Sequence, residues 1–368
     1  MIEQHFGESS EWSVGVEEEV MILDGETFAL APEVEAMIDA SQGRELPGRL
    51  KPELFASVVE LNTNACATAA EALEALAELR GSAAEIAEER GLLIAAAGSH
   101  PFSLAEEQAI APDPRYEEFV AYAGPSARRQ GVSGLHVHIG MPDAETCFAT
   151  LGAVLPWLPL VLALSANSPY FDGRETGLAS NRAEVLAQLP RSGAPPAFRS
   201  YLEWESFVER YVQLGLADGY TRFWWDIRPH PSLGTLEIRM PDQPTRLEVS
   251  GALIAVVQAL CAVLAGTTPR PTAAARGGYA QNRWAALRFG PRAEFVHPEG
   301  DRLVSVAELT AELVELIAPA VSSLGTAALV ESLDALSCEG DRQLEIGRRE
   351  GSKAVCADLV QRTVRSSA

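Results

Sequence analysis

Polar and apolar side chains alternate in four short, widely separated segments of the chain, and this pattern constrains the fold more than any other feature. Successive side chains of a β-strand point to opposite faces of its sheet, so residues of one parity share a face. The polar sets are Glu17 and Glu19 in residues 12–23, Glu60 and Asn62 in 58–62, His136 and His138 in 134–140, and Thr235, Glu237 and Arg239 in 235–240. The pattern predicts a sheet with one apolar face and one face rich in charged groups.

Helical periodicity occupies much of the chain between and after these segments. Helices are predicted over 65–97, with Gly81 as a break, over 245–264, and over 305–336, with interruptions near Pro319 and Gly325. Strands separated by helices that lengthen toward the C-terminus indicate an α+β fold, in which helices cover one face of a mainly antiparallel sheet. Because no segment has the length and composition of a linker, residues 1–368 are interpreted as a single catalytic domain.

The apolar stretch 151–166 has the composition of a membrane span. It is shorter than the roughly 20 residues that a bilayer requires, and it contains Pro156 and Pro159. We therefore predict a buried helix.

Charge and cysteine usage limit the classes of partner. The chain carries 29 Lys and Arg against 51 Asp and Glu, for a formal net charge of -22. Such a surface repels phosphate backbones and anionic lipids, which argues against nucleic-acid and membrane partners. The five cysteines lack CxxC spacing, and residues 1–10 contain no apolar signal core. We expect free thiols in a cytoplasmic protein that acts on small molecules.

The polar face of the predicted sheet is the candidate active site. Glu17, Glu19, Glu60 and Glu237 would repel one another there, since two charges about 5 Å apart cost about 3 kcal/mol at an effective dielectric of about 20. Divalent cations would relieve this repulsion, and clustered carboxylates are ligands that Mg²⁺ or Mn²⁺ prefers. Such a site suits phosphoryl transfer, and the chain has no GxxxxGK[ST] phosphate loop.

Other interpretations of the same residues stay open. Taken alone, each glutamate could be solvated or salt-bridged, and the two histidines could pack in a core. Glu18 falls on the apolar face of its segment, and the alternation assigns it no function. A metallohydrolase that needs no ATP and a non-catalytic nucleotide sensor are also compatible with the pattern.

Five motifs, taken together, resemble the bacterial carboxylate–amine ligases of the glutamate–cysteine ligase type 2 family. The motifs are Gly15–Glu19, Pro52–Thr63, Gly134–Gly140, Thr176–Arg182 and Asp226–Arg239. The resemblance implies a glutamine synthetase/guanido kinase-like catalytic domain, with a curved antiparallel sheet whose concave face holds ATP between metal ions. A guanidino phosphotransferase on the same fold is the nearest rival.

Site roles follow from the resemblance position by position. It implies two metal sites, one formed by Glu19, Glu53 and Glu60 and the other by Glu17, His136 and Glu237. His138 and Arg239 would face the phosphates of ATP. Arg182 would bind the acidic substrate or stabilise the transferring phosphoryl group, with Arg228 as a second cation and Asn62 in the substrate site.

The resemblance also implies a reaction. ATP would phosphorylate the γ-carboxylate of L-glutamate in a Mg²⁺-dependent step, with Mn²⁺ as a substitute, and an amine would then displace phosphate. L-cysteine is the implied amine, although relatives differ in the amine that they accept. The sequence is compatible with a homodimer and sets no oligomeric state.

Overall fold

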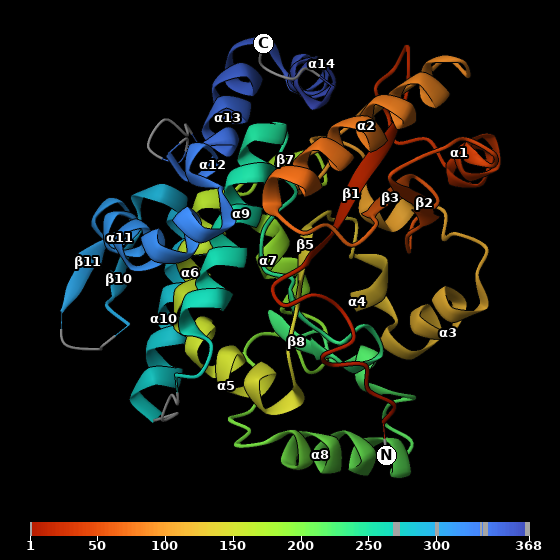
Figure 1. Cartoon of the computed structure of the whole chain (residues 1–368). Helices are drawn as coiled ribbons and strands as arrows, with labels where there is room; N and C mark the ends of the chain where they lie inside the picture. Colours follow the sequence, from red (N-terminus) through yellow and green to blue (C-terminus); the bar gives the residue numbers. More distant parts are fainter. Residues whose placement is uncertain (1, 268–272, 299–301, 332, 334–337, 365–368) are drawn as a thin grey trace.

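The computed structural model describes residues 2–267, 273–298, 302–331, 333 and 338–364. The centre of this part of the chain is an antiparallel sheet in the order β2-β3-β1-β5-β9-β8, with β4 paired to the far half of β1. Figure 1 shows β1 crossing the molecule beside β3 and β5. The strands of this sheet are β1 (Val14–Asp24), β2 (Gly48–Pro52), β3 (Val58–Thr63), β4 (Leu92–Ala95), β5 (Leu135–Gly140), β8 (Ile227–His230) and β9 (Thr235–Ile238).

Helices cover the apolar face of the sheet. Val16 of β1, Val137 of β5 and Ile238 of β9 belong to one buried cluster with these helices. In Figure 1, α2 runs over β1, and α9 lies among the other helices of the layer. Most of the cluster comes from the helices α2 (Ala69–Glu88), α5 (Ala144–Val154), α6 (Leu158–Ser165), α9 (Leu247–Leu264), α10 (Ala273–Phe289), α11 (Val306–Leu324) and α12 (Ala327–Glu331). The predicted α+β class is confirmed.

The helices differ from the sequence prediction at several points. The predicted helix over 65–97 is shorter in the structure, because its last part forms β4 and pairs with β1. Gly81 does not break α2, because the buried face of that helix continues through Ala83 to Ile86 and offsets the roughly 1 kcal/mol cost of glycine. The stretch 151–166 is buried as expected, but a 3₁₀ turn at Leu155–Trp157 divides it. Pro319 lies inside α11 without interrupting it, whereas Gly325 ends the helix in a left-handed conformation. Residues 332 and 334–336 of the predicted 305–336 helix lie outside the described residues.

Two helical stretches are long and apolar enough to cross a membrane by length and composition, Ala144–Ser165 and Leu247–Leu264. Most of each is buried within the fold. The core helices of soluble proteins have the same properties.

The remaining elements surround the sheet. Met21 and Leu23 have the same parity as Glu19 but lie in an apolar cluster with residues of α13 and α14, so the polar face of β1 ends before Met21. The remaining helices and strands outside the sheet and its helical layer are α1 (Val34–Ser41), α3 (Pro114–Ala123), α4 (Pro125–Arg128), β6 (Tyr170–Phe171), β7 (Arg174–Glu175), α7 (Asn181–Leu186), α8 (Tyr201–Gln213), β10 (Glu294–Val296), β11 (Leu303–Ser305), α13 (Glu339–Glu350) and α14 (Ser352–Thr363).

Glu18 has a structural partner that its sequence position did not reveal. Its carboxylate accepts hydrogen bonds from Arg80 of α2 at 2.6 and 2.8 Å, and both side chains are fully buried. Ser250 of α9 and Gln243 donate to the same carboxylate at 2.6 and 3.0 Å. Glu18 therefore ties β1 to the helical layer, on the side away from Glu17 and Glu19.

Candidate active site

Strand register brings the predicted polar residues together. Glu17 of β1 lies opposite Asn62 of β3 on one side and His136 of β5 on the other. One step along, Glu19 lies opposite Glu60. Across the neighbouring β5–β9 strand pair, His138 of β5 lies opposite Glu237 of β9. The four segments thus form one continuous polar surface, as their parity predicted.

Glu19, Glu53 and Glu60 form the first group, in which one carboxylate oxygen from each residue lies within 4.8 Å of those of the other two. Burial and then the neighbouring charges raise the pKa of Glu53 to about 7 and that of Glu60 to about 8. Burial also raises the pKa of Glu19 to about 7, against the opposing charge of Arg182. Lys51 lies 3.5 Å from Glu60. The resemblance assigned this same trio to one metal ion.

The second group consists of Glu17, His138 and Glu237. His138 Nδ1 lies 3.0 Å from the Thr235 hydroxyl, and its Nε2 lies 3.7 Å from Glu17 and 3.9 Å from Glu237. Within the described residues this buried Nε2 has no hydrogen-bond partner. Thr235 thus orients the ring so that Nε2 is directed at the two carboxylates.

His136 occupies a different place from the one that the resemblance implied. Its Nδ1 lies 3.2 Å from Glu17 and its Nε2 lies 3.7 Å from Glu19. Burial lowers the pKa of His136 to about 4, so the ring stays neutral at ordinary pH. His136 therefore lies between the two carboxylate groups, and the structure gathers His138, rather than His136, with Glu17 and Glu237.

Both groups fit a divalent cation. Oxygen-rich carboxylate sets suit Mg²⁺, and a group with one imidazole also suits Mn²⁺. Burial, more than the neighbouring carboxylates, raises the pKa of all three side chains in the first trio, and a bound cation would instead favour their charged forms. In the second group, the orphaned Nε2 of His138 is a ligand atom already directed at the centre.

Arginines surround these carboxylates on the β8–β9 side. Arg239 pairs with Glu237, and Arg228 pairs with the other oxygen of that carboxylate at 2.8 Å. Arg228 also donates to the backbone oxygen of Thr221 at 2.9 Å. Arg228 therefore holds Glu237 in place, and in this structure its donors are engaged by the protein rather than free for substrate.

Arg182 and Asn62 lie beside the carboxylate groups. Arg182 is 2% exposed and donates to the backbone oxygens of Met240 and Arg239 at 3.1 and 3.0 Å. Its guanidinium passes so close to Gly134 that a Cβ there would meet Nη2 at 2.0 Å. Asn62 donates to Glu17 at 3.0 Å and so orients that carboxylate.

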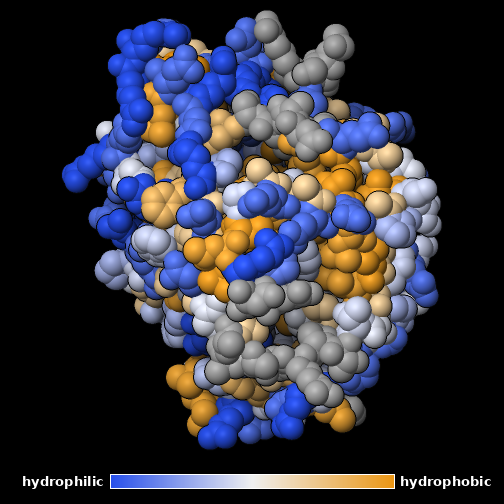
Figure 2. All heavy atoms as spheres, turned by 90° about the vertical axis from the view of Figure 1, so that its left-hand side faces the viewer, coloured by the Kyte–Doolittle hydropathy of each residue, from blue (hydrophilic) through white to orange (hydrophobic). Residues whose placement is uncertain are grey.

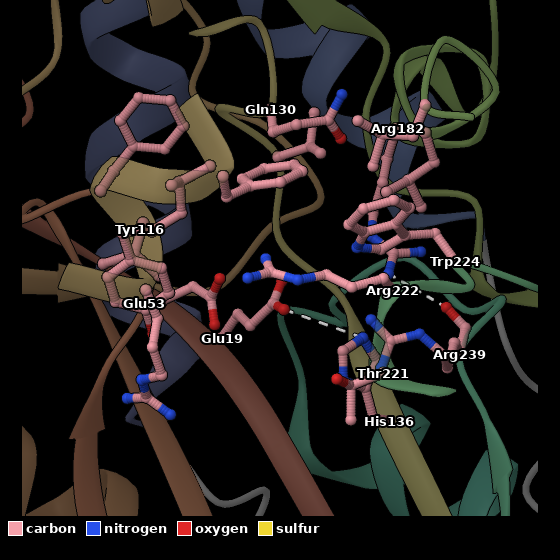
Figure 3. A pocket seen from close by; sticks show the side chains of 18 of the residues that line it. Glu19, Glu53, Tyr116, Gln130, His136, Arg182, Thr221, Arg222, Trp224 and Arg239 are labelled. Carbon is pink, nitrogen blue, oxygen red and sulfur yellow. Dashed lines mark hydrogen bonds and ion pairs between the residues drawn. The ribbon is translucent and has the colours of Figure 1, made fainter. Parts of the chain in front are cut away.

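A cavity of about 530 Å³ opens beside the first carboxylate group (Figure 3). Glu19, Glu53 and His136 line its inner end, together with Arg182 and Arg239. Its outer wall includes residues that have no role in the predicted site: Arg115, Tyr116, Glu118, Phe119, Gln130, Asp218, Thr221, Arg222 and Trp224. The cavity places a substrate next to the carboxylates and two arginines.

The outer wall was missed because strand alternation carries no information about it. Arg115 and Tyr116 begin α3, which follows an Asp-Pro start signal at 113–114 that could have located the helix. Arg222 and Trp224 lie in or just after the 3₁₀ turn Tyr220–Arg222, and nothing in the local sequence connects that turn to the sheet.

Comparisons with known proteins agree with this geometry. Residues 13–356 match the family described as Glutamate-cysteine ligase family 2. A candidate glutamate–cysteine ligase 2-3 from Rubrobacter xylanophilus is 40% identical over 366 residues, which covers 98% of this chain and 100% of the relative. A candidate glutamate–cysteine ligase 2 from Herpetosiphon aurantiacus is 35% identical over 360 residues, covering 96% and 93%.

Two solved structures share the fold at low sequence identity. The glutamate–cysteine ligase of Francisella tularensis, solved with AMP, superposes with a TM-score of 0.71 at 14% identity, covering 97% of this chain and 89% of that one. The bifunctional glutathione synthetase of Pasteurella multocida gives 0.70 at 16% identity, covering 96% and 52%. The chain belongs to glutamate–cysteine ligase family 2 and is a ligase of that type.

Proposed function

We propose that the protein is an ATP-dependent ligase that joins the γ-carboxylate of L-glutamate to an amine, with L-cysteine as the leading amine. The observation that carries the proposal is the meeting of the two acidic groups, Glu19–Glu53–Glu60 and Glu17–His138–Glu237, on one face of the sheet. The glutamate–cysteine ligase names of the relatives support the choice of substrates. A cytoplasmic location, where ATP is supplied and thiols stay reduced, is part of the proposal.

The two acidic groups would hold Mg²⁺, or Mn²⁺ as a substitute. When bound, such ions neutralise phosphate oxygens of a nucleotide and the charge that develops during phosphoryl transfer. His136, which lies against both Glu17 and Glu19, would keep the two carboxylates oriented toward their own groups.

The chemistry of amide formation explains the need for ATP. A carboxylate is a poor electrophile, so the γ-phosphoryl group is first transferred to its oxygen, which gives an acyl phosphate and ADP. The amine nitrogen then attacks the acyl carbon, loses a proton, and phosphate leaves. Arg239 and Arg182 line the cavity beside Glu19 and supply fixed positive charge for the phosphoryl group in transfer.

The cavity walls contribute by orientation. Its inner end is buried, so an acid bound there is surrounded by little water. The fixed charges of the cavity therefore interact more strongly with that acid than they would in water. Holding acid and amine in one cavity beside the nucleotide can supply several kcal/mol of the barrier reduction.

An ADP-release assay with L-glutamate, L-cysteine, ATP and Mg²⁺ tests the proposal. We expect ADP and phosphate in equal amounts, dependent on both substrates and abolished by EDTA. With heavy oxygen in the γ-carboxylate of glutamate, one labelled oxygen should appear in phosphate. ADP formed on a guanidino substrate alone would favour the phosphotransferase, and hydrolysis without nucleotide would favour the metallohydrolase.

A further inference from the structure

The two ends of the cavity differ in chemistry. At the inner end Glu19 and Glu53 lie with Arg182 and Arg239. At the outer end Arg222 lies with apolar side chains and with the exposed carboxylates of Asp218 and Glu118. Phe119, Leu189 and Trp224 provide apolar surface there. Figure 3 labels Arg222 next to Trp224, and both side chains line the cavity.

The ion pairs of Arg222 are exchangeable. Its guanidinium donates to Asp218 at 2.8 to 3.1 Å and lies 3.9 Å from Glu118. The Asp218 and Glu118 side chains are 61% and 71% exposed, while that of Arg222 is 21% exposed. An ion pair with an exposed partner contributes little, because water competes for both charges. A carboxylate arriving through the cavity can therefore replace Asp218.

The other arginines of the cavity are less suited to receive a second carboxylate. Arg182 donates to two backbone oxygens, and Arg239 pairs with buried Glu237. Arg115 pairs with Asp113 and is 73% exposed, so a carboxylate bound to it would stay in water.

Arg191 fixes the backbone that carries Arg222. Its Nε donates to the backbone oxygen of Arg222 at 3.0 Å. Its guanidinium lies 5.3 Å from the ring centre of Phe223 and 5.7 Å from that of Trp224, and it also contacts Tyr122 and Tyr211. Arg222 therefore combines a rigid base with a guanidinium whose partners can exchange, as a ligand-binding arginine requires.

We propose that Arg222 binds the α-carboxylate of the amine substrate, so that this ligase selects α-amino acids over amines that lack a carboxylate. The apolar wall beside it accepts an uncharged side chain, which includes that of cysteine. This inference rests on the proposed function, and it names the class of the second substrate.

The test compares pairs of amines that differ only in the carboxylate: L-cysteine with cysteamine, and L-alanine with ethylamine. The variants are Arg222→Gln, Asp218→Asn and Arg199→Gln. Arg199 is a matched control, because it also pairs with an acid four residues away and is 85% exposed. Steady-state ADP release gives KM and kcat for each amine and for L-glutamate, and titration calorimetry gives amine binding without turnover.

Arg222→Gln should raise KM for the amino acids by about 10- to 100-fold, the range expected for a lost hydrogen bond to a charged group. KM for the amines without a carboxylate and KM for L-glutamate should change by less than about 2-fold. Asp218→Asn should lower KM for the amino acids, since it frees Arg222, and Arg199→Gln should match the wild type.

Three results would overturn the inference: an equal effect of Arg222→Gln on both members of each pair, an increase confined to KM for L-glutamate, or no effect. If the wild type makes no ADP with any acid and amine, the proposed function fails. The role of Arg222 is then tested by the binding of amino acids in titration calorimetry. Arg222-dependent binding of amino acids would then support the carboxylate site, and equal binding by the wild type and Arg222→Gln would refute it.

Discussion

Replacing Glu60 by glutamine tests whether the Glu19–Glu53–Glu60 group is built for a cation. Glutamine keeps the shape of the side chain and removes its charge. Burial, followed by the charges of Glu17 and Glu53, raises the pKa of Glu60 from its ordinary 4.5 to about 8. At about 1.4 kcal/mol per pKa unit this is at most about 5 kcal/mol, and because the three carboxyls relax together we expect about 1–3 kcal/mol from Glu60.

The sign of the pH effect follows from this shift. An acid whose pKa is higher in the folded chain than in the unfolded one stabilises the fold while it is protonated. That contribution is complete below 4.5 and is lost as the pH rises through about 8. Metal-free wild-type protein should therefore lose stability over this range, and Glu60→Gln should lose about 1–3 kcal/mol less. In EDTA near the upper end of the range, the variant should be the more stable protein.

Urea unfolding followed by circular dichroism, with EDTA or with Mg²⁺, measures both effects. Mg²⁺ that binds only the folded state adds about 2.7 kcal/mol at 100 times its Kd. We expect this gain in the wild type and a much smaller gain in Glu60→Gln. Glu88→Gln on the exposed side of α2 is the control and should behave like the wild type. Equal pH slopes and equal Mg²⁺ gains in Glu60→Gln and the wild type would refute the reasoning.

Three further substitutions probe the site and its support. Glu237→Gln should lower kcat for ADP release by at least about 100-fold, because it removes a negative charge from one acidic group. Its circular dichroism spectrum should stay unchanged, and turnover at the wild-type rate would contradict the assignment of Glu237 to the site. Glu18→Gln should cost about 3–5 kcal/mol in urea unfolding, because it leaves Arg80 buried without its counter-charge, and a cost below about 1 kcal/mol would contradict this. Gly134→Ala should raise KM for L-glutamate or lower kcat by displacing Arg182, with little change in KM for the amine, and unchanged kinetics would contradict the assigned contact.

The candidate site was predictable to the extent that it lies on strands. Period-two alternation placed Glu17, Glu19, His136 and Glu237 on one face, and the observed register confirms that they meet. Alternation gives faces but not distances. The choice between His136 and His138 as the partner of Glu17 and Glu237 depends on ring orientation, which the Thr235 hydroxyl sets across a strand pair.

The parts that the sequence did not predict depend on long-range contacts. Gly81 was expected to end a helix from its propensity, but the packing of α2 against the sheet and α9 outweighs that preference. Arg222 and Trp224 are held at the cavity by contacts with distant residues, among them Arg191, about thirty residues earlier. No local pattern reports such a contact.

Consecutive glutamates on β1 explain how a site with so much negative charge can be rigid. Glu17 and Glu19 face the cavity side, while Glu18 faces Arg80 and the helical layer. Gln243 links the two sides, since it donates to Glu18 and accepts from the backbone nitrogen of Glu19. Repulsion within the acidic groups would push β1 away from its neighbours, and the buried Glu18–Arg80 pair resists that movement from behind. The loss of stability in Glu18→Gln should therefore be accompanied by weaker Mg²⁺ binding, although Glu18 is no ligand.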